Sequence, residues 1–303
     1  MEKPSVSVVI PNYNHAPFLR ERIDSVLAQD YTDFEVILLD DCSTDDSRDI
    51  IRSYEGHPHV SQIVLNSKNS GTPFAQWAKG ISLAKGEMVW IAESDDVADP
   101  QLLGTLMAEL KLHERAAVAF VHSRLIDQEG HQLPYGWHDE DTGEVRVSQG
   151  RQFVISKMLT SNYIYNASMA VFRKSAFARI GRGYMEYRYC GDWAFWAELC
   201  LQGEVIEVGR VLNSYRQHVG MTTKQSLTTG GKWIEVGDIL KSLSTLLHLT
   251  GWQHRCLRGR YTKRFAREDV PNRDAILARH ADLFGASQFD ICCYELGKVF
   301  GFL

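Results

Sequence analysis

Residues 5–47 read SVSVVIPNYNHAPFLRERIDSVLAQDYTDFEVILLDDCSTDDS, and this stretch decides the expected fold. The apolar run at 6–10 predicts a buried strand, and a polar turn at 11–15 follows it. Apolar side chains recur at helical spacing over 18–27 and predict a helix, with Pro17 near its start. The run at 34–39 predicts a second strand, which ends in two aspartates. Strands alternating with helices in this order predict a mostly parallel α/β sheet covered by helices on both faces.

The same alternation continues along the first half of the chain. Capping residues at 43, 44 and 46 predict a helix that runs to about 54, and we also expect a strand at 60–65, a helix at 73–84 and a strand at 88–92. Polar clusters follow three of the strands, at 11–14, 40–41 and 93–96. Because ligands bind beyond the carboxyl ends of parallel strands, these clusters predict one site built from three loops.

The second half of the chain is less regular. Residues 128–150 are polar and predict a hairpin or a mobile loop, and strands at 168–173 and 205–215 flank a helix that begins at Asp192. After Gly230 the pattern is helical, with an apolar stripe formed by Ile239, Leu240, Leu243, Leu246 and Leu247.

Composition narrows the functional class. The 303 residues carry a net charge of −5, which argues against a broad nucleic-acid-binding surface. The N-terminus lacks a signal-peptide pattern, and no apolar run reaches the roughly 18 residues that span a bilayer. The six cysteines include no Cys-x-x-Cys pair, so reduced thiols and a cytoplasmic location are expected. The Lys-, Arg- and Leu-rich segment after Gly230 is compatible with peripheral contact at the inner face of a membrane.

The sharpest local feature is Glu93-Ser94-Asp95-Asp96, directly after an apolar strand. Three carboxylates in four residues repel one another, and a divalent cation with oxygen ligands would offset that repulsion and hold a diphosphate. The alternative is a solvated acidic turn in which Asp99 caps the next helix. The residues alone leave both interpretations open.

Two other clusters are equally ambiguous. Asp40 and Asp41 either help to cap the following helix or let Asp41 accept a hydrogen bond from a base ring N–H. Pro11 and Tyr13 either flank that base or form a turn. These alternatives also remain open.

The downstream candidates are Asp192, Arg216 and His218. Asp192 opens an amphipathic helix, where it serves as an N-cap, as a general base for an acceptor hydroxyl, or as both. Its position at a helix start predicts a depressed pKa. His218 is either structural or a ligand of a metal–diphosphate site, with Arg216 nearby.

Taken together, these motifs resemble the family 2 glycosyltransferases, whose catalytic domain has the GT-A fold. The resemblance begins with residues 5–47. It continues through KNSGTPFAQWAKGISLAKGEMVWIAESDDVADP, which contains an Asn-x-Gly loop and a DxD-like metal motif. It ends with the GDW at Asp192 and the YRQH that ends at His218. It covers roughly residues 5–220. It implies a catalytic domain at 1–225, with a donor half at 1–127 and an acceptor half at 128–225, and a helical extension at 226–303.

The resemblance also implies roles for single residues. Asp96 and His218 would bind Mn²⁺ or Mg²⁺, with the role of Glu93 open because Asp is commoner at that position. Asp192 would deprotonate the acceptor for an inverting displacement. Contacts with the nucleotide sugar would come from Pro11, Tyr13, Asn14, Asp41, Asn69, Gly71, Asp95 and Arg216. Cys42 stands where the family usually has glycine.

The expected activity is therefore transfer of a sugar from a UDP- or dTDP-sugar to a glycan or lipid-linked glycan in bacterial surface polysaccharide assembly. Residues after 220 are expected to shape the acceptor site or a homo-oligomer contact. A sugar nucleotidyltransferase would need a Gly-rich, basic loop after the first strand, and PNYNHAPF has neither feature. A dehydrogenase would need GxGxxG there. A non-catalytic nucleotide-sugar-binding or scaffold protein is the remaining alternative.

Overall fold

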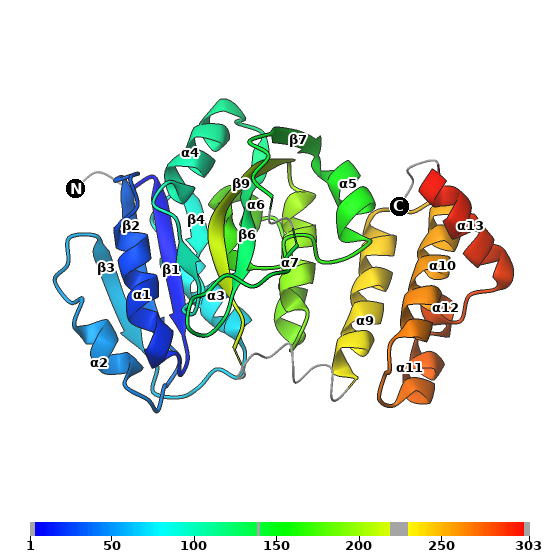
Figure 1. The fold of residues 1–303 in the computed structure, drawn as a ribbon, viewed down its shortest axis with the longest axis horizontal. Coiled ribbons are helices and arrows are strands. Elements are labelled where there is room, and N and C mark those ends of the chain that lie inside the picture. The colour runs from blue at the N-terminus through cyan, green and yellow to red at the C-terminus, as the bar shows by residue number, and fades with distance from the viewer. Residues whose placement is uncertain (1–3, 138–139, 219–229, 300–303) are drawn as a thin grey trace. The chain divides into compact units, whose positions relative to one another are not determined.

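Residues 4–137, 140–218 and 230–299 are described by a computed structural model (Figure 1). The chain forms two units, which are described separately. The first contains the chain up to residue 148 together with 166–181 and 202–218. The second contains 149–165, 182–201 and the helices from residue 230 onward. The predicted domain boundary between residues 225 and 226 lies outside the described residues.

The first unit is built on a sheet whose N-terminal part is parallel. Its parallel strands are β1 (Val6–Asn12), β2 (Phe34–Asp40), β3 (Val60–Leu65) and β4 (Met88–Ile91), in the spatial order β3-β2-β1-β4. Every residue of β1, β2 and β4 is buried. Near-continuous apolar strands are typical of sheets covered on both faces, so the strand predictions in this region are confirmed.

Beyond β4 the sheet becomes mixed. The remaining strands are β5 (Val97–Ala98), β6 (Ala116–Ile126), β7 (Val145–Gln149), β8 (Ala170–Arg173) and β9 (Glu204–Arg216). β8 runs antiparallel between β4 and β6, whereas β6 and β9 are parallel. β5 and β7 both pair with β9. The predicted α/β class is confirmed, although the sequence did not identify β6 and the sheet is mixed beyond β4.

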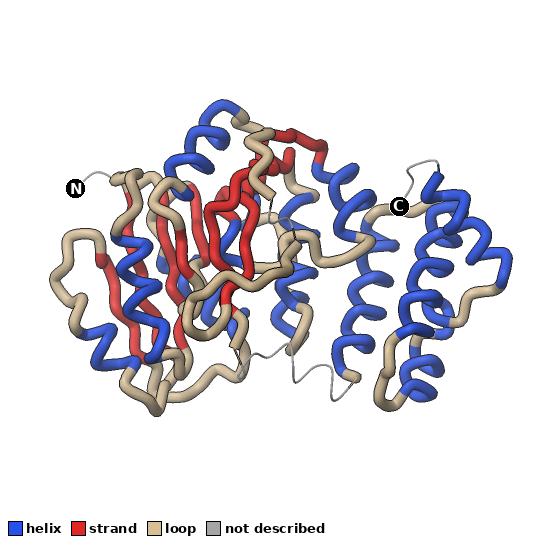
Figure 2. Tube along the Cα trace, viewed as in Figure 1, coloured by secondary structure: helices blue, strands red, loops and turns tan. Residues whose placement is uncertain are grey.

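Helices flank this sheet, as Figure 2 shows. They are α1 (Ala16–Leu27), α2 (Ser47–Arg52), α3 (Pro73–Leu83), α4 (Leu102–Leu112), α6 (Lys174–Phe177) and the 3₁₀ turn η2 (Ala167–Met169). Prolines occupy the first turns of α1 and α3, as predicted. α3 packs closely on β1 because Gly80 has no side chain: a Cβ there would lie 2.2 Å from Cγ1 of Val9.

The second unit is helical. It contains α5 (Gly150–Phe153), the π-helix η1 (Val154–Met158), the 3₁₀ turn η3 (Gly183–Glu186), α7 (Gly191–Cys200), α9 (Gly231–Leu246), α10 (Gly251–Arg267), α11 (Arg273–Arg279), α12 (Ala281–Phe284) and α13 (Gln288–Val299). The predicted C-terminal helices are therefore present.

An aromatic cluster holds the C-terminal helices together. Trp233 packs edge-on against Phe265 and Phe284, which stack on each other at 4.9 Å. The predicted stripe is buried except for Leu246, the last residue of α9, which is 52% exposed. Within the described ranges, none of the helices is both long and apolar enough to cross a bilayer.

Candidate functional site

The carboxyl ends of β1, β2 and β4 lie at one edge of the sheet, because these strands are parallel. The backbone N–H of Asp41 donates to Asn12 O at 2.9 Å, which links the ends of β2 and β1. The N–H of Ala92 donates to Val9 O at 2.8 Å, which links β4 to β1. The three polar loops are thus brought together, as the sequence pattern predicts.

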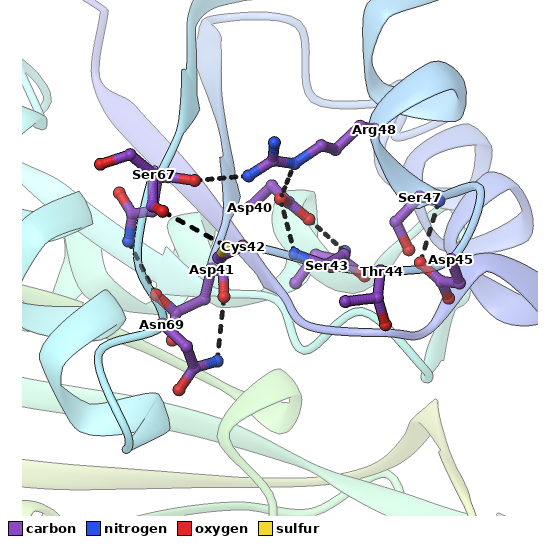
Figure 3. A network of polar contacts seen from close by, with 12 residues as sticks. Asp40, Asp41, Cys42, Ser43, Thr44, Asp45, Ser47, Arg48, Ser67 and Asn69 are labelled. Carbon is purple, nitrogen blue, oxygen red and sulfur yellow. Dashed lines mark hydrogen bonds and ion pairs between the residues drawn. The ribbon is translucent and has the colours of Figure 1, made fainter.

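The loop after β2 is fixed by its first aspartate, Asp40. The buried Asp40 carboxylate accepts hydrogen bonds from Arg48 Nε at 2.8 Å and Ser43 N at 3.0 Å (Figure 3). It also accepts one from Asn12 Nδ2 at 3.1 Å. Cys42 adopts a left-handed conformation with φ of +66°, where glycine meets no steric penalty. This agrees with the glycine that the resemblance places there. Asp40 therefore holds the loop in shape.

The second aspartate of this pair, Asp41, organises the next loop. Its carboxylate accepts hydrogen bonds from Asn66 Nδ2 at 2.7 Å, Gln76 Nε2 at 2.7 Å and the backbone and hydroxyl of Ser70 at 3.0 and 2.7 Å. Asn69 donates to the Asp41 carbonyl at 2.9 Å. The side-chain oxygen of Asn69 also accepts from the N–H of Gly71, whose φ is +84°, at 2.8 Å. The predicted nucleotide contacts at 41, 69 and 71 thus form one hydrogen-bonded unit of the protein.

The turn after β1 presents one aromatic ring to solvent. Tyr13 is 47% exposed, whereas Pro11 is buried inside β1. Asn14 is left-handed, with φ of +55°, and its side-chain oxygen accepts from the N–H of Thr44 at 2.7 Å. Of the three residues, Tyr13 is the one whose side chain is placed to stack on a ligand ring.

The acidic loop after β4 contains one inward-facing carboxylate, that of Asp96. It is 1% exposed and accepts three hydrogen bonds: from Ser168 Oγ at 2.6 Å, Asn166 Nδ2 at 2.8 Å and the backbone N–H of Arg216 at 3.0 Å. Burial and the charge of Asp95 raise the pKa of Asp96 to about 6. Its contacts join the acidic loop to η2 and β9.

Asp95 points to a different group of side chains. His218 Nε2 lies 3.1 Å from Asp95 Oδ2, and the His15 and His218 rings pack edge to face at 5.3 Å. One ligand atom from each of these three residues lies within 4.8 Å of the others. Burial alone would raise the pKa of Asp95, but the hydrogen bond from His218 and the nearby imidazoles bring that pKa below its ordinary value.

His15 is held by the acidic loop itself. Its Nδ1 is 2.8 Å from Ser94 Oγ, which fixes the orientation of the ring. Burial is the main factor that lowers the pKa of His15, and this favours the neutral imidazole that binds metals. Two imidazoles and one carboxylate therefore converge where the sequence predicted Asp96 and His218.

Glu93 is partly exposed and bonds to α3. Its carboxylate accepts a hydrogen bond from Trp77 Nε1 at 2.7 Å. Burial, together with the charges of Asp95 and Asp96, raises the pKa of Glu93 to about 8. Glu93 is thus protonated at neutral pH, and it anchors the loop to α3.

Arginines on two elements counter the acidic loop. The fully buried guanidinium of Arg22 lies over the ring of Trp90, 5.1 Å from its centre. Burial lowers the pKa of Arg22 to about 10, against the opposing effect of the three carboxylates. Arg216 is also buried, and its guanidinium donates to the Asp95 carbonyl at 2.7 Å and to Glu21 at 2.6 Å. Arg216 therefore fixes the backbone of the loop.

Asp192 belongs to the second unit. It lies in the first turn of α7, and the N-cap position is occupied by Cys190. Asn162 Nδ2 donates to Asp192 Oδ2 at 2.7 Å, and Trp193 Nε1 donates to Met158 O at 2.8 Å. Burial raises the pKa of Asp192 to about 7, so the predicted depressed pKa was wrong. The loss of water outweighs the effect of the helix start.

Several residues of the site were missed from the sequence, namely His15, Arg22, Asn162, Asn166 and Ser168. His15 carried the clearest available signal, since it stands in the first polar turn. The partners of Asp96 lie 70 and 72 positions away in the chain, and no local pattern marks them.

The contacts of Asp96 predict a stability effect. In Asp96→Ala, the donors on Asn166, Ser168 and Arg216 lose their shared acceptor. Unpaired buried donors cost about 1–3 kcal/mol each, and relief of repulsion from Asp95 offsets part of this, so we expect a loss of about 2–4 kcal/mol. Urea unfolding of the variant and of Asp49→Ala, an exposed control, measures the difference. Unchanged stability would contradict the structural role of Asp96.

Comparison with known proteins identifies the family of this chain. Residues 7–181, more than half of it, match the family "Glycosyl transferase family 2". In Bacillus subtilis, the protein named "Putative teichuronic acid biosynthesis glycosyltransferase TuaG" is 34% identical over 128 residues, which cover 42% of this chain and 50% of TuaG. Glycosyltransferase GlyG of Streptococcus pneumoniae is 36% identical over 106 residues, 35% of each chain. The matches thus span half or less of these two relatives.

Solved structures share the fold at low identity. TarS 1–349 of S. aureus in complex with UDP-GlcNAc matches with a TM-score of 0.61 at 19% identity, over 94% of this chain and 74% of that one. The mannosyltransferase PcManGT from Pyrobaculum calidifontis, in complex with GDP-Man and Mn²⁺, matches with a TM-score of 0.57 at 18% identity, over 100% and 82%. The GT-A-like fold is thereby confirmed, and the chain belongs to the family 2 glycosyltransferases.

Proposed function

We propose that this chain transfers a sugar from a nucleoside-diphosphate sugar to a hydroxyl of a glycan or lipid-linked glycan. The observation that carries the proposal is the convergence of His15, Asp95 and His218 at the carboxyl edge of the sheet. The loop that supplies His15 also exposes Tyr13. A cation site beside an aromatic ring suits a ligand with a diphosphate and a base.

The donor set fits a manganese ion better than a magnesium ion. Mn²⁺ accepts imidazole nitrogen together with carboxylate oxygen, whereas Mg²⁺ prefers oxygen ligands. Asp95 Oδ2 and His218 Nε2, 3.1 Å apart, are spaced like neighbouring ligands of one ion. We therefore assign the cation to His15, Asp95 and His218 in place of Asp96. A bound cation would neutralise the diphosphate and the charge that develops on it as it leaves.

The nucleotide is assigned to the loops after β1 and β2. Tyr13 would stack on the base or line its pocket, with Pro11 and Asp41 supporting the same pocket. The complex of TarS with UDP-GlcNAc and that of PcManGT with GDP-Man support a nucleoside-diphosphate sugar as the donor class. Of the candidate nucleotides, we favour UDP and dTDP.

Acceptor activation is assigned to Asp192. The acceptor oxygen would form a bond to the anomeric carbon as the bond from that carbon to the diphosphate oxygen breaks. The hydroxyl proton would pass to the Asp192 carboxylate, and the nucleoside diphosphate would leave. One such displacement inverts the anomeric centre. A carboxyl whose pKa is about 7 is well matched to this task near neutral pH.

The acceptor class is inferred from the relatives. The name of TuaG refers to teichuronic acid biosynthesis. This supports a cell-surface polysaccharide, or its lipid-linked precursor, as the acceptor.

The proposal is tested by calorimetric titration of UDP, dTDP and GDP into the protein, first with Mn²⁺ and then with EDTA. We expect one nucleotide to bind in the presence of Mn²⁺ and its affinity to fall by at least about tenfold in EDTA, because the cation bridges the protein and the diphosphate. If folded protein binds none of the three nucleotides, the donor assignment fails and a non-catalytic scaffold becomes the better explanation.

A further inference from the structure

The chain segment that leads into α7 is held by one carboxylate from α9. Glu235 accepts hydrogen bonds from three successive backbone N–H groups: Arg188 at 2.7 Å, Tyr189 at 2.8 Å and Cys190 at 2.8 Å. Successive amides that converge on one anion form a compact anion-binding turn, here filled by a side chain of the protein. Glu235 thus fixes the path of the backbone immediately before α7.

This contact matters because α7 has no side-chain cap at its start. Its N-cap residue, Cys190, makes no capping hydrogen bond through its side chain. Asp192 follows two residues later and is oriented by Asn162. Two elements hold the start of α7. Met158 O of η1 accepts a hydrogen bond from the Trp193 side chain, whereas Glu235 of α9 binds the backbone before the helix.

We infer that Glu235 is a positioning residue for Asp192: by binding the amides of residues 188–190, it sets the direction in which α7 presents the Asp192 carboxylate. The inference rests on the proposed function, in which Asp192 activates the acceptor. It gives α9 an indirect part in the reaction, because α9 supplies the carboxylate that positions the general base.

The same carboxylate also acts on Asp192 through its charge. Burial is the main cause of the raised pKa of Asp192, and the negative charge of Glu235 raises it further. The hydrogen bonds from Asn162 and from the backbone N–H of Trp193 oppose the shift. Two cations, Lys232 on α9 and Arg264 on α10, also act on Cys190.

Two substitutions separate position from charge. Glu235→Ala removes both, and we expect kcat for sugar transfer to fall by about 10- to 100-fold, because a displacement of about 1 Å at a reacting group costs that much. The donor KM and the nucleotide Kd should remain unchanged. Glu235→Gln keeps one acceptor oxygen, so it should recover part of kcat. Both variants should move the acid limb of the kcat–pH profile to lower pH, because a negative charge beside Asp192 is gone.

The control is Asp238→Asn, on the same helix. Asp238 pairs with Arg279 at 2.7 Å, whereas the amides of residues 188–190 donate to Glu235, so kcat and the pH profile should stay at wild-type values. If Glu235→Ala does not fold, the inference is tested by the position of the acid limb in the kcat–pH profile of Glu235→Gln. Wild-type kcat and an unmoved acid limb in a folded Glu235 variant would overturn the inference. Retained transfer in Asp192→Asn would instead remove the proposed base, and would do so independently of Glu235.

Discussion

Replacing Asp192 with asparagine will lower kcat for sugar transfer by about three orders of magnitude, the middle to upper range for loss of a general base. The amide keeps the size of the side chain and can still bond Asn162, so α7 should remain folded. Nucleotide binding in the presence of Mn²⁺ should not change, because the donor contacts are assigned to other elements. Transfer assays with the donor identified by calorimetry measure the effect.

The wild-type pH dependence gives the same role a second check. Because burial raises the pKa of Asp192 to about 7, the carboxyl is protonated below that pH and cannot accept a proton. kcat should therefore rise about tenfold per pH unit below 7 and level off above it. Asp192→Asn should lose this limb. The control is Glu198→Gln, further along α7, which should keep the rise of kcat with pH below 7. Turnover in Asp192→Asn close to that of Glu198→Gln would exclude Asp192 as the base.

Replacing Asp95 with alanine will abolish metal-dependent nucleotide binding. Asp95 supplies the only carboxylate of the three-residue cluster found in the described part of the chain. Mutation of residues that only orient the metal ligands already lowers metal affinity about 10- to 100-fold. Loss of the ligand Asp95 itself should therefore lower Mn²⁺ affinity at least about 100-fold. Mn²⁺ titration followed by electron paramagnetic resonance measures the ion directly, without any need for activity.

The comparison with Asp96 makes this test specific. Asp95→Ala should lose Mn²⁺ with little loss of stability, because the side-chain interaction that is lost is the pair with His218. Asp96→Asn, which keeps the shape of the buried side chain, should bind Mn²⁺ with an affinity much closer to that of the wild type. Loss of Mn²⁺ only in the Asp96 variant would restore the assignment made from the sequence.

The N-terminal part of the fold is predictable because its signals are local. Strands β1 to β4 are short apolar runs, and α1 and α3 begin at prolines. β6 was missed, and with it the reversal of direction at β8. The pairing of β8 between β4 and β6 depends on contacts distant in the chain, for which the sequence contains no periodic signal.

In the site, too, residues with a local sequence signal were predicted, whereas those that depend on contacts distant in the chain were not. The acidic loop and His218 were found because their residue types suggest metal binding. Which of Asp95 and Asp96 points toward His15 and His218 was not predictable. Neighbouring residues point in different directions, and Asp96 is turned away by its bonds to Asn166, Ser168 and Arg216. The pKa of Asp192 was misjudged for a related reason, because burial is a property of the folded chain.

The anchoring of Asp96 also constrains the order in which the protein acquires its site during synthesis. The parallel strands β1, β2 and β4 can pair once about the first hundred residues have left the ribosome, but the three donors to Asp96 follow 70 to 120 positions later in the chain. Until then the acidic loop lacks its internal partners. A chain that stops before β9 would lack the donor from Arg216, so the acidic loop reaches its final contacts only after β9 has been made.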